Sequence, residues 1–123
     1  MNSTLLLQSS AWLLVATAAG GLLMAFIRFG RRGLNPPAWL AMAHGFLAAA
    51  SVTLLTFAAL TVGVPGLALG GLVLLLVAAA GGVAMNLGYH LKGAPLPKWL
   101  VGVHAAAAIA GSALVLLAAI GTR

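Results

Sequence analysis

The sequence predicts an all-α protein: a four-transmembrane-helix bundle built from two parallel two-helix repeats. Of its 123 residues, 63% are hydrophobic and 5% are charged, and the mean hydropathy is +1.18. No water-soluble domain could cover such a core with polar surface. Four apolar stretches are each long enough to cross a bilayer, which needs roughly 20 helical residues. The second half of the chain also resembles the first, so residues 1–123 are expected to form a single integral membrane domain.

The four helices are expected near residues 9–29, 38–62, 66–88 and 97–121. Lipid offers no hydrogen-bond partners to the backbone, so spanning segments of this length must be helices rather than open strands. Pro37 and Pro97 suit the first turn of the second and fourth helices, where a missing N–H costs nothing. Trp39 and Trp99 follow them and are typical anchors at a membrane interface.

Basic residues are confined to the first and third connections between these helices. The first carries Arg28, Arg31 and Arg32, the third carries His90, Lys92 and Lys98, and the second, residues 61–66, has no charge. Positive loops remain in the cytoplasm, so these two connections are predicted to be cytoplasmic and the topology N-out, C-out. The net charge of +6 therefore reflects topology and does not indicate nucleic-acid binding. The Ala- and Gly-rich composition favours a bacterial inner membrane as the location.

An internal repeat relates residues 11–60 to residues 71–120. A gapless alignment with a spacing of 60 gives 14 identities in 50 positions, among them Trp39/Trp99 and His44/His104. Each repeat holds two helices, so both enter the membrane in the same direction and are related by an axis along its normal. The two histidines then lie at one depth, roughly 7–8 Å below the tryptophans at 1.5 Å per residue.

Two neutral imidazoles facing each other in a membrane bundle are best explained by a haem, whose iron takes one axial ligand on each face. Small residues such as Gly45, Ala48 and Ala105 would leave room for the ring. The anionic propionates would need cationic partners at the cytoplasmic surface. The chain offers Arg28, Arg31, Arg32, Lys92 and His90 there.

In its helix number and paired histidines the chain resembles the four-helix membrane b-type cytochromes. The resemblance implies one haem b between the second and fourth helices, ligated by His44 and His104, and electron transfer to or from a quinone or a partner subunit. The commoner members hold two haems, whereas this chain has only two intramembrane histidines. His90, at a helix end, is expected to face solvent or lipid. Met24, Met42 and Met85 are expected to be packing residues rather than ligands.

Two alternatives stay open at this point. The histidines could hold another cofactor such as a chlorin or a quinone. They could also do no more than hydrogen-bond neighbouring helices, in which case the chain is a non-catalytic accessory subunit of a larger membrane complex. An electron carrier or accessory subunit is expected rather than a stand-alone enzyme, in contact with the bilayer and with other membrane subunits or a second copy of the chain.

The residues that the chain lacks exclude several classes of function. It contains no Asp, Glu or Cys. Proton-coupled carriers, cation channels with acidic rings and carboxylate metal sites all need acidic side chains. Thiolate ligands and thiol nucleophiles need cysteine. No Ser-His-acid set, phosphate-binding Gly loop or zinc pattern is present either, so no hydrolytic chemistry is expected.

Overall fold

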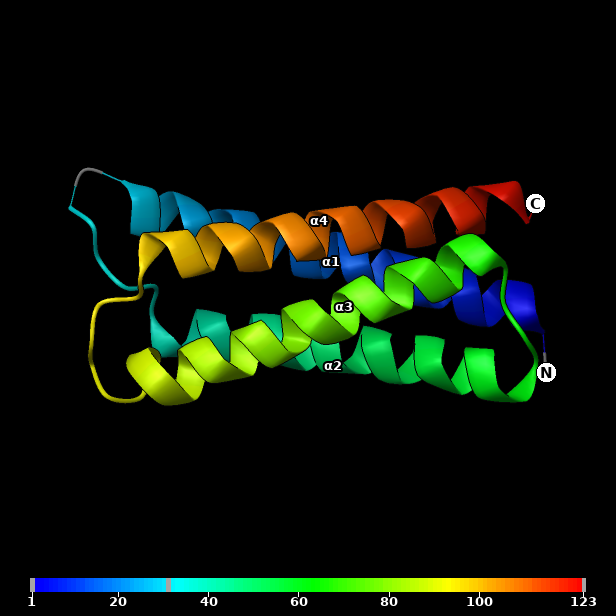
Figure 1. The fold of residues 1–123 in the computed structure, drawn as a ribbon, viewed down its shortest axis with the longest axis horizontal. Helices are drawn as coiled ribbons and strands as arrows, with labels where there is room; N and C mark the ends of the chain where they lie inside the picture. The colour runs from blue at the N-terminus through cyan, green and yellow to red at the C-terminus, as the bar shows by residue number, and fades with distance from the viewer. Residues whose placement is uncertain (1, 31, 123) are drawn as a thin grey trace.

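The computed structural model describes residues 2–30 and 32–122, and within them it consists of helices and their connections, without a strand. The helices are α1 (Ser3–Phe29), α2 (Ala38–Thr61), α3 (Gly66–Met85) and α4 (Lys98–Gly121), and a π-helical turn, η1 (Asn86–His90), extends α3. They run alternately up and down the bundle (Figure 1). Both chain ends and the α2–α3 connection lie at one end, the terminus end. The other two connections lie at the opposite end, the loop end.

The first helix begins six residues earlier than the sequence pattern predicted, at Ser3 rather than near residue 9. Asn2 is the reason, because its side-chain oxygen accepts a hydrogen bond of 2.9 Å from the backbone N–H of Thr4 and so caps the helix. The 27 residues of α1 make it the longest of the four helices. At 1.5 Å per residue it spans about 40 Å, which exceeds the hydrocarbon thickness of a bilayer.

All four helices are long and apolar enough to cross a membrane. Large apolar side chains cover the outside of the bundle: the exposed fraction is 78% for Phe26, 81% for Leu60 and 70% for Trp12. Soluble monomers rarely expose a continuous apolar surface of this kind. The structure therefore indicates an integral membrane protein whose outer surface contacts lipid.

The buried core is concentrated at the terminus end. Leu7 and Leu14 of α1, Leu55 of α2 and Val115 of α4 are each exposed by 2% or less, and they belong to one apolar cluster. The first half of α1 and the last half of α4 contribute to this cluster, together with the end of α2 and the start of α3. Tight packing at this end fixes the four helices relative to one another.

Within the core the two helices of each hairpin, α1–α2 and α3–α4, approach closely at small residues. The hydroxyl of Ser51 in α2 donates a 2.9 Å hydrogen bond to the carbonyl of Ser10 in α1. In the other hairpin Gly71 and Gly111 meet, and a Cβ added to Gly71 would lie 2.7 Å from the carbonyl oxygen of Gly111. Small residues of this kind let membrane helices pack backbone against backbone.

Hydrogen bonds join the first and third connections at the loop end. Arg28 Nε donates to the carbonyl of Leu96 at 2.7 Å, and Asn35 Nδ2 donates to the carbonyl of Ala94 at 2.7 Å. The N–H of Leu96 in turn donates to Asn35 Oδ1 at 3.0 Å. The two hairpins are thus packed together at one end of the bundle and tied together at the other.

Candidate functional site: a cavity with two histidines

A large cavity lies between the hairpins, on the loop-end side of the packed core. Its volume is about 1040 Å³, and residues of all four helices line it. Ligand pockets in proteins typically measure about 300–1,000 Å³, so this one is large enough for a cofactor. It extends from Leu14 and Leu116, beside the core, to Arg28 and Leu96 at the loop end. Most of the lining is apolar, and much of it consists of alanine and glycine.

His44 of α2 and His104 of α4 line this cavity from opposite hairpins. Their ring centroids are 6.3 Å apart, and the ring planes make an angle of 68°. The two imidazoles therefore share one depth in the bundle and one cavity. Each is the only histidine of its helix, so no other imidazole of α2 or α4 competes for this place.

Each imidazole is oriented by a backbone carbonyl of the other helix in its hairpin. His44 Nδ1 lies 2.9 Å from the carbonyl oxygen of Thr17 in α1, and His104 Nδ1 lies 2.8 Å from that of Ala78 in α3. A carbonyl oxygen only accepts hydrogen bonds, so Nδ1 of each neutral ring carries the proton. The lone pair is then on Nε2. Carbonyls that fix the tautomer in this way are the usual outer partners of metal-bound histidines.

A pair of glycines makes room for each ring. A Cβ added to Gly21 would lie 3.0 Å from His44 Cε1, and one added to Gly82 would lie 3.2 Å from His104 Cε1. A Cβ added to the preceding residue, Gly20 or Gly81, would lie at ordinary contact distance, 3.8 Å or 3.9 Å, from the same ring. Both imidazoles thus lie against a Gly-Gly pair of the neighbouring helix, and a larger residue at Gly21 or Gly82 would displace the ring.

These contacts change the register that the sequence alignment assumed. The residues matched in α1 and α3 are 61 apart, as in Gly20/Gly81 and Gly21/Gly82, whereas His44 and His104 are 60 apart. With a spacing of 61, residues 11–24 match residues 72–85 at seven positions instead of the four found with 60. The second half has one residue fewer before its connection, and the π-helical turn η1 occupies that segment. A spacing of 60 therefore holds for α2, for α4 and for the glycines of the connections before them, Gly33 and Gly93, but not for α1 and α3.

The cations that the sequence singled out are separated by the structure. Arg28, in the last turn of α1, has an exposed fraction of only 9% and lines the cavity, and its guanidinium also donates to the carbonyls of Gly33 and Leu96. Arg32 and Lys92 are exposed on the connections and do not line the cavity. Arg31 lies outside the described residues.

Other residues line the cavity that the sequence did not place there. His90, expected to face solvent or lipid, is a lining residue of η1, as is Asn86. The π-helical turn changes the direction in which side chains leave the helix, which the sequence pattern does not reveal. Met24, Met42 and Met85, which were expected to be packing residues, line the cavity as well.

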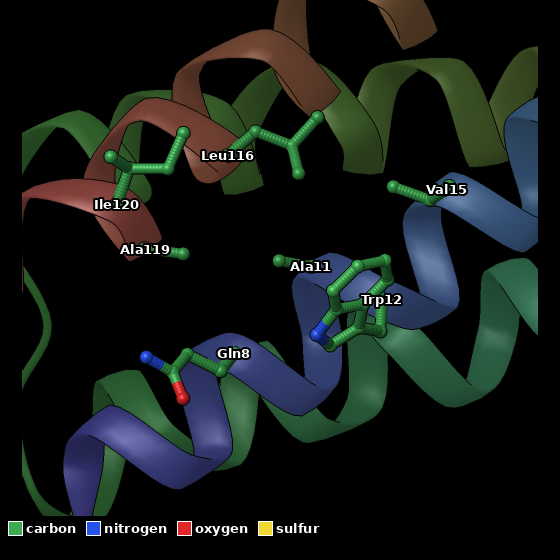
Figure 2. A pocket seen from close by; sticks show the side chains of 7 residues that line it. All are labelled: Gln8, Ala11, Trp12, Val15, Leu116, Ala119 and Ile120. Atoms are coloured by element: carbon green, nitrogen blue, oxygen red, sulfur yellow. The ribbon is translucent and has the colours of Figure 1, made fainter. Parts of the chain in front are cut away.

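A second, smaller hollow of about 210 Å³ lies between α1 and α4 at the terminus end (Figure 2). Gln8 and Trp12 are its polar side chains, and the remaining lining is apolar: Ala11, Val15, Leu116, Ala119 and Ile120. Neither a histidine nor a cation takes part in it. The candidate site is therefore the large cavity with the two imidazoles.

Comparison with known proteins adds no assignment. The chain matches no protein-family model, no curated protein and no solved structure. Among the described residues, no group of three or more His, Cys, Asp or Glu side chains is placed to hold a metal ion by itself. The fold and the site thus define a helical protein of the membrane type with an apolar cavity between its two hairpins, in which two imidazoles form a close pair.

Proposed function

We propose that the protein is a b-type cytochrome that binds one haem b between α2 and α4, with His44 and His104 as the axial ligands. In this proposal it carries electrons to or from a quinone or a partner subunit. It lies in a bacterial inner membrane with both chain ends outside and the loop end in the cytoplasm. The two hairpins are then parallel repeats, which their matching histidine contacts support.

The separation of the imidazoles is the observation that carries the proposal. An imidazole nitrogen bonds a metal at about 2.0–2.1 Å and lies about 1.1 Å from its own ring centre, so two imidazoles on opposite sides of one metal have ring centres about 6.3 Å apart. The observed separation of the His44 and His104 centroids is 6.3 Å. Both rings also keep Nε2 available, because Nδ1 is bonded to a carbonyl.

The composition of the site favours haem over a bare metal ion. Two imidazoles alone leave a metal under-coordinated, and the chain has no Cys, Asp or Glu to complete the set. A porphyrin supplies four ligands of its own, so the protein needs to provide only two. The apolar lining and the volume of the cavity suit its flat ring. When bound, haem supplies reversible one-electron chemistry.

Absorption spectroscopy of the detergent-purified protein tests this function. Protein from cells given ample haem is measured oxidised and then after reduction with dithionite. A sharp Soret band with resolved α and β bands on reduction is expected, because two strong-field imidazoles produce low-spin, six-coordinate iron. A colourless preparation that also fails to bind added haem would disprove the proposal.

A cavity-side glycine provides a subtler test. Gly21→Ala places a methyl group 3.0 Å from His44 Cε1, which forces the imidazole to move. Since mutations of residues that orient metal ligands typically cost about 10–100-fold in metal affinity, haem affinity is expected to fall in that range. Gly20→Ala is the matched control, because its methyl would lie 3.8 Å from the same ring. Haem titration of the two variants makes the comparison, and equal affinities would contradict the expected role of Gly21.

The accessory-subunit function is the second candidate, and one observation favours it. Each histidine already has a hydrogen bond across its hairpin, which would be its whole role in a structural subunit. That interpretation does not explain the cavity or the 6.3 Å separation of the ring centroids. It predicts a colourless protein that co-purifies with other integral membrane subunits.

A further inference from the structure

Three polar side chains meet the cavity at its loop end. They are Arg28 from the last turn of α1 and Asn86 and His90 from η1. Arg28 is buried, with an exposed fraction of 9%, whereas Asn86 and His90 are partly buried. The opposite end of the cavity, near Leu14 and Leu116, adjoins the apolar core. The hydroxyl residues Thr17, Thr53 and Ser112 line the part of the cavity nearer that core, so the cavity is cationic at the loop end only.

The charge of Arg28 has no protein counter-ion. The chain contains no Asp or Glu, so no side-chain carboxylate can pair with this guanidinium. Its hydrogen bonds to the carbonyls of Leu96 and Gly33 satisfy Nε and Nη1 but leave the positive charge uncompensated. Burying an unpaired charge is strongly unfavourable, and an anion bonded to it offsets part of that cost. Of the five N–H donors of a guanidinium, several remain for such an anion.

Asn86 and His90 add neutral donors beside this cation. Among the described residues neither side chain has a hydrogen-bond partner, so both are available to a ligand. They reach the cavity through the π-helical turn, a feature often found at functional sites. Arg28, Asn86 and His90 are hereafter called the polar end.

We infer that the polar end is a carboxylate-binding subsite, which selects a cofactor bearing free acid groups and fixes the direction in which it enters the cavity. The inference rests on the proposed function and refines it. The acid groups of the macrocycle lie against the polar end, and its apolar edge lies toward Leu14 and Leu116. Arg32 and Lys92, exposed on the connections, take no direct part in binding.

The experiment compares protohaem with its dimethyl ester, in which both carboxylates are neutral and the iron is unchanged. Each is titrated into the apo-protein in the same detergent, and axial ligation is followed by the Soret band. Wild-type protein is expected to bind the diacid about 10- to 100-fold more tightly than the diester, the range that one or two hydrogen bonds to a charged group provide. The ratio of the diacid affinity to the diester affinity, rather than either affinity alone, is compared among variants, since the ester partitions more strongly into detergent.

Variants of the loop end test which residues produce the preference for the diacid over the diester. Arg28→Met is expected to abolish it, but this change also removes two hydrogen bonds to the connections and could unfold the loop end. The double variant Asn86→Leu/His90→Leu leaves those bonds intact, and it is expected to lower the ratio by about tenfold. Arg32→Gln and Lys92→Gln are the matched controls, because they remove exposed cations of the same loop end. Their ratios are expected to equal the wild-type ratio.

Two results would overturn the subsite, and they differ from the failure of the cytochrome proposal. Wild-type protein that ligates diacid and diester equally well would remain a haem protein without a carboxylate subsite. A preference that disappears in Arg32→Gln or Lys92→Gln but persists in the double variant would place the anion on the exposed connections instead. Failure of both ligands to bind would refute the cytochrome function together with its subsite.

Discussion

Replacement of either His44 or His104 by alanine is expected to lower the haem affinity of the protein by more than about 100-fold, since even outer-shell changes at metal sites cost 10–100-fold. Each substitution removes one of two axial bonds, and the chain offers no Cys, Asp or Glu in its place. Haem content per mole of purified protein is the measurement. Both variants should lose nearly all of it, because the two rings are equivalent in the geometry of the site.

A matched control separates ligation from helix packing. Ser51→Ala removes a buried hydrogen bond between α1 and α2, the same hairpin that the His44–Thr17 bond joins. Such bonds contribute about 0.6 kcal/mol in membrane bundles, so this variant should remain folded and fully loaded with haem. A full haem load in both histidine variants would contradict the ligand assignment. Loss of haem in Ser51→Ala as well would show that retention reports only the integrity of the hairpin.

The largest effect on stability is expected from Gly71→Ala. The new methyl group would lie 2.7 Å from the carbonyl oxygen of Gly111 and 3.2 Å from the backbone nitrogen of Val115. Backbone atoms cannot move aside as a flexible side chain can, so α3 and α4 must separate. Overpacking of this kind typically costs about 1–3 kcal/mol. Thermal unfolding in detergent, followed by the helical circular dichroism signal, should show a lower midpoint.

The neighbouring residue supplies the comparison for this experiment. Gly70→Ala makes the same change in helix propensity, but its methyl would meet only a side-chain carbon of Leu114 at 3.7 Å. Its unfolding midpoint should stay at or above the wild-type value, because alanine favours helix over glycine. Equal destabilisation of the two variants would mean that α3 and α4 do not pack at Gly71 as described.

Much of the fold could be predicted from the sequence because it follows from hydropathy and length. Four apolar stretches in a chain of this composition leave no option but spanning helices, and three of their starts were expected within a residue. The start of α1 was expected too late, because hydropathy does not detect the side-chain cap that Asn2 provides for a helix starting at Ser3. The depth and pairing of His44 and His104 were inferred from their positions in the repeat, and the structure places them in one cavity.

The rest of the site depends on contacts that no sequence pattern encodes. Backbone carbonyls of Thr17 and Ala78 orient the imidazoles, and any residue type could supply a carbonyl there. Alanines and leucines match at either spacing, so a gapless alignment does not reveal that the spacing changes from 61 in α1 and α3 to 60 in α2 and α4. The sequence does not distinguish Arg28 from the other cations of the loop end. Only its buried position beside Leu96 distinguishes it from the exposed Arg32.

The division of the bundle into a packed terminus end and a tied loop end separates the residues that hold the helices together from the imidazole pair. Neither the core cluster nor the hydrogen bonds between the connections include His44 or His104. Stability and the chemistry of the pair are therefore carried by different residues of one small bundle. Substitutions of the two imidazoles should alter what the cavity binds while the four helices keep their packing at both ends.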